Sequence, residues 1–364
     1  MLATTKKRIL DLSYSELREL MVAWGEPSYR ANQVLGWVYQ KGAVAVDEMT
    51  DLPLSLRERL TLETQLPILK PIETRVSSDG LTRKTLFELS DGSTIESTLM
   101  RYNPGESARE RGTVCVSTQV GCPIGCPFCA TGGQGFTRNL SQGEIVGQVL
   151  HCLRQSGVGE KGTKRPLTNI VFMGMGEPLA NYEAVVGAIN LLNASYGLNL
   201  NARHITLSTV GLIPQIYRLI EDGVRVELAI SLHAPDNELR NRLVPVNRKY
   251  PVEELIRAAK EFLKKTGRRP SFEYALFKGV NDSPRCAREL ARLLKGLNTQ
   301  VNLIAGNSTG KEEFKAPERQ RTLDFLKELR SHGVSATLRE PRGLDIDGGC
   351  GQLRSRYLIS QERK

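Results

Sequence analysis

The spacing of apolar residues predicts helices in the first 65 residues. In "SYSELRELMVAW" (13–24), Ser13 and Glu16 have the spacing of a capping box, and apolar residues follow at intervals of three and four. The same spacing runs through "YRANQVLGWVYQKG" (29–42), where a glycine ends the pattern. We therefore expect a small helical accessory domain over residues 1–65.

Strict alternation replaces the helical period in the next segment. The stretch "SSDGLTRKTLFELSDGSTIESTLMRY" (77–102) holds two Asp-Gly pairs, with alternating apolar residues between and after them. Asp-Gly turns flanked by such alternation are typical of β-hairpins. The pattern predicts a short antiparallel β ribbon within residues 66–105.

From residue 114 onward, strand patterns alternate with amphipathic helical patterns. About six such units in series imply a parallel sheet covered by helices, and about 230 residues favour a partial or full (β/α) barrel over a doubly wound sheet. We expect this α/β barrel over 106–342, with functional groups at the carboxyl ends of its strands, and a separate C-terminal segment over 343–364. The expected strands begin at residues 114, 169, 204, 226, 271, 300 and 335.

The composition is that of a globular protein with a basic surface. The longest apolar runs, such as 170–173 and 226–232, are no longer than a strand, so no membrane contact is expected. The N-terminus lacks the apolar core of a secretion signal, which predicts a cytoplasmic location. Lys and Arg number 50 against 40 Asp and Glu, an excess that favours nucleic acid as partner. Basic clusters lie at 161–165, 240–249, 264–269 and 354–356.

Three of the seven cysteines form the sharpest motif. Cys122, Cys126 and Cys129 have the spacing C-x₃-C-x₂-C in the glycine-rich stretch "GCPIGCPFCATGGQGF", directly after the first barrel strand. Such a loop can wrap three corners of a [4Fe–4S] cluster and leave one iron open to another ligand. Zinc is the competing interpretation, but structural zinc sites usually take four protein ligands and no second C-x₂-C follows.

The cysteine spacing, with Phe128 before the last cysteine, resembles the signature of radical S-adenosylmethionine (SAM) enzymes. This resemblance implies a partial (β/α)₆ barrel, one [4Fe–4S] cluster per chain and SAM bound at the open iron. Five further stretches narrow the resemblance to one family within this superfamily: "FMGMGEPLANY", "ITLSTVGLIP", "AISLHAP", "NLIAGN" and "DIDGGCGQLR". Together they resemble the RlmN-type RNA methyltransferases, over nearly the whole chain. That family methylates C2 of adenosine 2503 in 23S rRNA and of adenosine 37 in tRNA.

The resemblance also implies a set of residues that contact SAM. Each has a plainer interpretation: Gly176 as a turn glycine, His233 as a hydrogen-bonded core residue, Ser208 and Asn307 as ordinary loop residues. Position at the end of the fourth barrel strand favours the functional interpretation of His233, whereas the assignment of Ser208 and Asn307 rests on the resemblance. The residues are Gly176, Glu177, Ser208, Ser231, Leu232, His233 and Asn307.

Adenine C2 has no lone pair, so it cannot attack a SAM methyl group as a nucleophile. A cysteine thiolate can, and the S-methyl group then carries hydrogens that a radical can abstract. The resemblance assigns this carrier role to Cys350, the resolving role, by a transient disulfide with Cys350, to Cys115, and proton acceptance to Glu96. The same resemblance implies that two SAM molecules are used per turnover and that the helical domain over residues 1–65 contacts RNA. By itself Glu96 would be read as a solvated strand carboxylate, and Cys152 and Cys286 as packing residues in helices.

Two alternatives to this function stay open. A Cfr-type enzyme would methylate C8 of the same rRNA adenine with the same thiol chemistry. A non-catalytic RNA-binding module with a structural cluster would leave Cys115, Cys350 and Glu96 without a role. For the C2 enzyme we expect 23S rRNA and tRNA as partners, an electron donor such as flavodoxin or ferredoxin, and a monomer.

Overall fold

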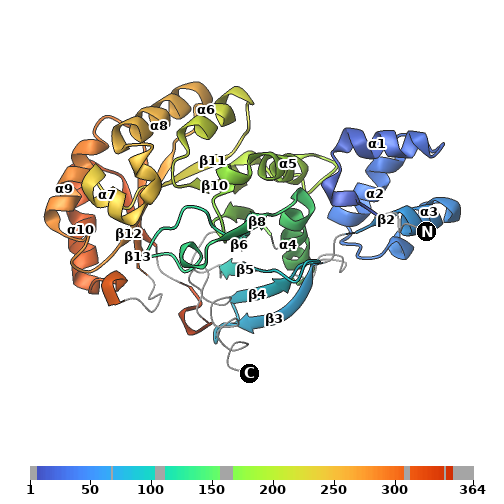
Figure 1. Ribbon diagram of the computed structural model, residues 1–364, viewed down its shortest axis with the longest axis horizontal. Coiled ribbons are helices and arrows are strands. Elements are labelled where there is room, and N and C mark those ends of the chain that lie inside the picture. Colours follow the sequence, from blue (N-terminus) through green and yellow to red (C-terminus); the bar gives the residue numbers. More distant parts are fainter. Residues whose placement is uncertain are drawn as a thin grey trace.

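A single sheet of ten strands organises the molecule (Figure 1). The computed structural model describes residues 6–66, 69–102, 111–155, 167–306, 312–339 and 342–346. The strand order in the sheet is β14-β13-β12-β11-β10-β9-β6-β5-β4-β3. Their bounds are β3 (Lys70–Val76), β4 (Thr82–Glu88), β5 (Thr94–Tyr102), β6 (Arg111–Cys115), β9 (Asn169–Phe172), β10 (Ile205–Thr209), β11 (Glu227–Ser231), β12 (Ser271–Leu276), β13 (Gln300–Ala305) and β14 (Ala336–Arg339).

The part of the sheet from β6 to β14 is parallel, and helices return the chain between its strands. This confirms the predicted partial (β/α)₆ barrel, to which β14 adds a seventh parallel strand. Its helices cover the convex side (Figure 1). They are α4 (Gln142–Gln155), α5 (Tyr182–Asn193), α6 (Ile213–Glu221), α7 (Asn237–Leu243), α8 (Val252–Thr266), α9 (Pro284–Leu293) and α10 (Arg319–Ser331).

The antiparallel ribbon is continuous with the barrel sheet. Strand β5 pairs with β6, with Thr98 opposite Cys115, so β3, β4 and β5 extend the same sheet. The pairing covers the edge of β6, whose N–H and C=O groups would otherwise lack partners. Side chains of the ribbon and of the barrel therefore share one face of the sheet.

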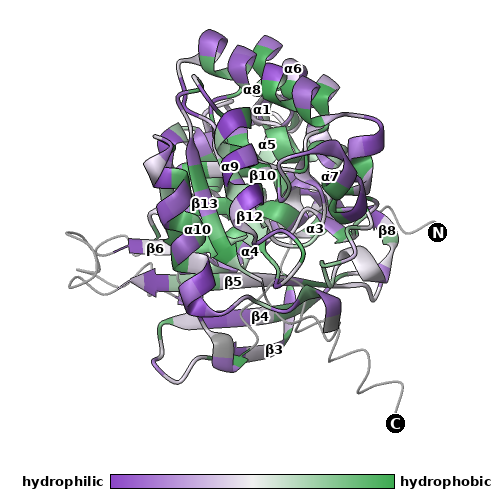
Figure 2. Cartoon of the chain, turned by 90° about the vertical axis from the view of Figure 1, so that its left-hand side faces the viewer, coloured by the Kyte–Doolittle hydropathy of each residue, from purple (hydrophilic) through white to green (hydrophobic). Residues whose placement is uncertain are grey.

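The two faces of the sheet differ in polarity. One face packs against the helices through apolar side chains such as Phe172 and Ile230, which are fully buried. The other, inward face carries polar side chains at alternating positions, including Ser208, Ser231 and Glu273. The helices show the complementary pattern, as in α9 and α10, where hydrophobic and hydrophilic segments alternate along each helix (Figure 2). The hydrophobic core lies between sheet and helices, which leaves the inward face for function.

The N-terminal helices form a small unit beside the barrel (Figure 1). They are α1 (Tyr14–Ala23), α2 (Arg30–Tyr39) and α3 (Leu54–Glu63), and the predicted capping box of Ser13 and Glu16 is present. Two-residue strands, β1 (Lys7–Arg8) and β2 (Thr64–Gln65), join the two ends of the unit. The Asp11 carboxylate accepts a hydrogen bond from the Gly143 N–H at 2.6 Å, which ties the unit to the start of α4.

The described ranges contain no helix with the length and apolarity needed to cross a membrane.

Candidate active site

A short strand pair fixes both ends of the cysteine loop. The strand expected from residue 114 divides into β6 and β7 (Gln119–Gly121), and β7 pairs with β8 (Phe136–Asn139), which the sequence pattern did not reveal. The Cys122 N–H donates to the Gly135 carbonyl at 2.8 Å. Gly121 has φ +76°, and a Cβ there would lie 1.9 Å from the Gly135 carbonyl oxygen. Only glycine fits at position 121, and the loop between the strands is held at its base.

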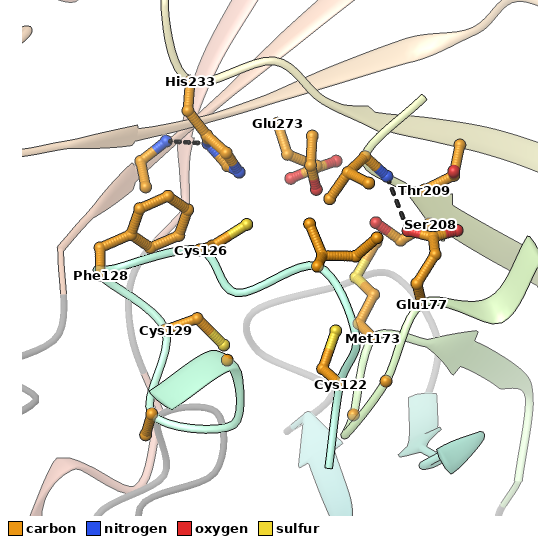
Figure 3. A pocket seen from close by; sticks show the side chains of 18 of the residues that line it. Cys122, Cys126, Phe128, Cys129, Met173, Glu177, Ser208, Thr209, His233 and Glu273 are labelled. Atoms are coloured by element: carbon orange, nitrogen blue, oxygen red, sulfur yellow. Dashed lines mark hydrogen bonds between the residues drawn. The ribbon is translucent and has the colours of Figure 1, made fainter. Parts of the chain in front are cut away.

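The three cysteines of this loop line a pocket at the carboxyl ends of the barrel strands (Figure 3). Burial raises the pKa of Cys122 to about 12, and burial together with the neighbouring thiols also raises the pKa of Cys126. Thiols in this setting become thiolates when they bind cationic iron or another metal. In the described part of the chain, no three His, Cys, Asp or Glu side chains lie close enough together to hold one metal ion.

The "GMGEP" turn brings a buried carboxyl group to the pocket wall. Gly176 has φ +102°, and a Cβ there would lie 2.6 Å from the Cβ of Gln119. A larger residue would collide at this position, so the turn needs a glycine. The carboxylate of Glu177 accepts hydrogen bonds from the N–H groups of Leu179 and Val210. Burial raises the pKa of Glu177 to about 7. A cationic group of a ligand would favour its ionised form.

His233 faces the pocket as a neutral hydrogen-bond donor. It has the left-handed backbone φ of 59°, and its Nδ1 accepts a hydrogen bond from the Ala275 N–H at 3.0 Å. Burial, assisted by Arg240, lowers its pKa to about 3. The proton of the neutral ring is therefore on Nε2, which is directed into the pocket (Figure 3). His233 is therefore both a hydrogen-bonded core residue and a residue that lines the pocket.

The remaining predicted SAM contacts have different surroundings. Ser208 and Ser231 line the pocket. Leu232 is fully buried in the core, and its backbone bonds to Glu273 and Arg240 rather than turning to the pocket. Asn307 lies outside the described residues.

Glu96 and Cys115 lie on the inward face of adjacent strands. Glu96 is only 4% exposed and its carboxylate lies 2.7 Å from the Lys84 ammonium group, so the interpretation as a solvated carboxylate is wrong. Cys115 is opposite Thr98, two residues along β5 from Glu96. Strand β9, whose end leads to the "GMGEP" turn, pairs with the other edge of β6 at Cys115.

Cys350 lies outside the described residues, but a segment just before it contacts the ribbon. The Asp345 carboxylate accepts a hydrogen bond from the Ser78 N–H at 2.6 Å. The Arg342 guanidinium lies 4.1 Å from the centre of the Tyr102 ring. The chain is therefore anchored, five residues before Cys350, on the ribbon that carries Glu96.

Three charged residues of the inward face and the pocket rim were not predicted from the sequence. The position of Lys84 beside Glu96 becomes visible only with the strand register. Glu273 could have been noticed in the sequence, because it is a charged residue within the apolar strand "SFEYALF". Arg240 was assigned to a basic surface, which is wrong, because it is fully buried. Its guanidinium donates to the carbonyls of Val210, Ser231 and Leu232, at the ends of two barrel strands. Cys152 and Cys286 are buried in α4 and α9, which confirms their packing role.

Two family models match the chain. That of the "Radical SAM superfamily" matches residues 116–294, and that of the "Ribosomal RNA large subunit methyltransferase N-terminal domain" matches residues 7–66.

Similar proteins match the chain over nearly its full length. A "Probable dual-specificity RNA methyltransferase RlmN" of Dictyoglomus thermophilum is 46% identical, over 97% of this chain and 98% of that protein. One of Geobacillus thermodenitrificans is 46% identical over 98% and 94%. A crystal structure of a radical SAM methyltransferase from Sphaerobacter thermophilus has a TM-score of 0.89 and 48% identity, covering 95% of this chain and 98% of that one. The resemblance seen in the sequence motifs is confirmed, and the chain belongs to the RlmN family of the radical SAM superfamily.

Proposed function

We propose that this protein methylates C2 of an adenine in RNA, at adenosine 2503 of 23S rRNA and adenosine 37 of tRNA, through an S-methylcysteine intermediate. One observation carries the proposal. The inward face of a single continuous sheet bears Glu96 and Cys115 beside strand β9, which leads to the cysteine-lined pocket. Proton acceptor, resolving thiol and cofactor pocket would thus serve one substrate.

The pocket suits a [4Fe–4S] cluster and SAM. Cys122, Cys126 and Cys129 would hold the cluster, one per chain, because three thiols without a fourth protein ligand leave one iron open. When bound, the cluster supplies the electron that cleaves SAM to a 5′-deoxyadenosyl radical. Glu177 would accept hydrogen bonds from the cationic amino group of SAM, since that charge favours the carboxylate.

Other pocket residues would orient the rest of SAM. His233 offers its Nε2–H as a donor, while Gly176 lets the turn approach the ligand closely. Ser208 and Ser231 offer hydroxyl groups. Leu232 and Asn307 are proposed as SAM contacts from the family resemblance alone.

The thiols would carry the methyl group. Cys350 takes a methyl group from a first SAM, so that a sulfur–carbon bond forms as the SAM sulfonium bond breaks. A 5′-deoxyadenosyl radical from the second SAM would take one hydrogen atom from the S-methyl group, and the resulting methylene radical would add to the adenine carbon. The adduct would return one electron to the cluster and would give the proton of the adenine carbon to Glu96. Cys115 would then attack the Cys350 sulfur, so that a disulfide forms as the sulfur–methylene bond breaks, and the released methylene carbon would take up a proton to become the methyl group. The electron donor would reduce the disulfide to two thiols before the next turnover. Two SAM molecules are used in each turnover.

Lys84 would support the proton acceptor. Its ammonium, 2% exposed, lies 2.7 Å from the Glu96 carboxylate. This contact would hold the Glu96 carboxylate in a fixed position on the inward face of the sheet. The contacts of Arg342 and Asp345 with the ribbon favour delivery of Cys350 to this area.

The negatively charged RNA would be attracted to this protein by its excess of Lys and Arg. Several members of the predicted basic clusters are exposed and are candidates for phosphate contacts, as is the N-terminal helical unit: Arg242, Arg248, Lys249, Lys264, Lys265 and Arg269. We propose a monomer that works in the cytoplasm, with a reductant such as flavodoxin or ferredoxin as electron donor. We also propose the domain bounds expected from the sequence, which are 1–65, 66–105, 106–342 and 343–364.

Anaerobic incubation of reconstituted protein with SAM, a reductant and either a 23S rRNA fragment or tRNA tests the function. Mass spectrometry of the nucleosides should show 2-methyladenosine, and Cys350→Ala should abolish it. Methylation at C8 alone would instead identify a Cfr-type enzyme. RNA binding without methylation by protein with an intact cluster would leave the binding module as the function.

A further inference from the structure

Arg138, on strand β8 at the base of the cysteine loop, binds carboxylates from two other segments. Its Nη1 and Nη2 donate hydrogen bonds to the two oxygens of Glu144, at 2.8 and 3.0 Å. Its Nε donates to Oδ2 of Asp91 at 2.6 Å. Glu144 is in the first turn of α4, shortly after Arg138 in the chain, whereas Asp91 lies in the turn between β4 and β5 of the ribbon. One guanidinium thus joins the cysteine loop to the ribbon.

Glu144 orients the Arg138 side chain. Glu144 is 4% exposed, and its Oε2 also accepts a hydrogen bond from the Ser141 N–H at 2.9 Å. A carboxylate that binds both Nη groups of a guanidinium fixes the plane of that group. The remaining donor, Nε, is thereby held toward Asp91. An exposed ion pair between two mobile side chains contributes little to stability, but in this pair the arginine is already fixed by a buried carboxylate.

The N-terminal helical unit reaches the same place through a second arginine. Nη2 of Arg8 donates a hydrogen bond to Oγ of Ser90, the neighbour of Asp91, at 2.9 Å, and Nη1 lies 3.8 Å from the Glu144 carboxylate. Cations from the N-terminal unit and from β8 thus meet carboxylates from the ribbon and from α4. We call Arg8, Asp91, Arg138 and Glu144 the charged junction, because these four side chains join four segments of the molecule.

The charged junction is close, along the chain, to both halves of the proposed active site. In the strand register Arg138 is opposite Val120, which comes two residues before Cys122. Asp91 comes five residues before Glu96, and the start of β5 joins the two. A shift of the Asp91 turn relative to β8 would therefore change the distance between the cysteine-lined pocket and Glu96.

We propose that Arg138 is a positioning residue, which sets the place of the cysteine-lined pocket relative to Glu96 and thereby couples cleavage of SAM to methyl transfer. The assignment rests on the proposed function, because it needs both of these steps. Cleavage of SAM needs only the pocket, whereas methyl transfer also needs the base and Glu96 at the correct distance from it. Misplacement of reacting groups by about 1 Å can lower a rate roughly 100-fold. A loosened junction should therefore leave cleavage intact and reduce transfer.

The test compares two products, 5′-deoxyadenosine and 2-methyladenosine, after anaerobic incubation of cluster-containing protein with SAM, dithionite and a 23S rRNA fragment. Arg138→Met removes every contact of the guanidinium and keeps an unbranched side chain on β8. The ratio of 2-methyladenosine to 5′-deoxyadenosine should fall about tenfold or more in this variant, while 5′-deoxyadenosine forms at nearly the wild-type rate. A residue with a structural role alone would lower both products together and leave their ratio unchanged.

Asp91→Asn separates the contact with the ribbon from the contact with Glu144. The asparagine keeps Oδ1 as acceptor for the Ser93 N–H, but it places an amide NH₂ group where Oδ2 accepted from Arg138. The product ratio should fall in this variant too. The double variant Arg138→Met/Asp91→Asn should have the ratio of Arg138→Met, because both changes break the same contact.

Glu183→Gln is the matched control, since Glu183 forms an exposed ion pair of 2.7 Å with Arg218 outside the charged junction, and it should keep the wild-type ratio. A wild-type ratio in Arg138→Met with full iron content, or an equal fall in Glu183→Gln, would overturn the assignment. If Arg138→Met loses its iron or fails to fold, a wild-type ratio in Asp91→Asn overturns it instead. Wild-type protein that forms 5′-deoxyadenosine but no methylated adenosine would overturn the proposed function itself, which is distinct from the failure of Arg138 alone.

Discussion

At the scale of single residues, burial decides what each charged or titratable group of the site can do. Glu96 and Lys84 are removed from water together, Glu177 is held by backbone N–H groups, and His233 is neutral. That the three cysteines of the loop lie together could be predicted from their spacing in the sequence. The partner of Glu96 was not, because Lys84 reaches it only through the register of two strands twelve residues apart.

Loss of the Lys84 charge should destabilise the fold. Lys84→Met removes the cation beside a buried carboxylate, and breaking such a pair costs about 3–5 kcal/mol. Denaturant unfolding should therefore show a lower free energy of unfolding. The double variant Lys84→Met/Glu96→Leu, which removes both charges, should recover much of this loss; equal stability of the single variant and the wild type would contradict the ion pair.

Glu177 should make the stability of the cluster-free protein depend on pH. Its folded pKa, about 7, is above the ordinary value of 4.5, so its contribution is fully present below pH 4.5 and is lost as the pH rises through 7. Relative to Glu177→Gln, the wild type should lose about 3 kcal/mol across this window. Unfolding at several pH values measures the difference, and parallel curves for the two proteins would refute the shift.

At the scale of elements, the alternation of strands and helices predicted the barrel, whereas the shortest strands escaped prediction. Strands β7 and β8 have three and four residues, and β1 and β2 have two each, too few for a period to emerge. The pairing of β5 with β6 was equally hidden, because alternation predicts a strand but not its neighbour. These unpredicted pairs hold the cysteine loop and join the ribbon to the barrel.

The base of the cysteine loop should be intolerant of a side chain. Gly121→Ala would place a methyl group against the Gly135 carbonyl, so we expect a large loss of bound iron, measured per chain after anaerobic reconstitution. Gly125→Ala is the control: it has a similar φ of +70° but meets no atom within 4 Å. Similar iron content in both variants would show that strain alone, rather than the collision, matters.

At the scale of the whole molecule, one sheet connects segments far apart in the chain. Strands β3 to β5 come before the cysteine loop, and residues 342–346 return to the same ribbon after the barrel is complete. The sequence suggested separate ribbon and barrel units. Their continuity depends on which edges pair, a choice made by the complete fold.

This return of the chain predicts a specific disulfide. Mild oxidation of cluster-free protein should join Cys115 to Cys350, and peptide mass spectrometry should detect the link. Cys115→Ser should abolish it, while Cys286→Ala, which alters a buried helix residue, should not. A link from Cys350 to another cysteine in the wild type would contradict the assigned pair.

The buried guanidinium of Arg240 has a consequence for the kinetics of binding. It holds the carbonyls of Val210, Ser231 and Leu232 with hydrogen bonds internal to the protein, so this wall of the pocket is ordered before any ligand arrives. A preorganised wall loses little conformational entropy on binding. Association of SAM should then be a single step limited by encounter, and the affinity should be set by the rate of departure.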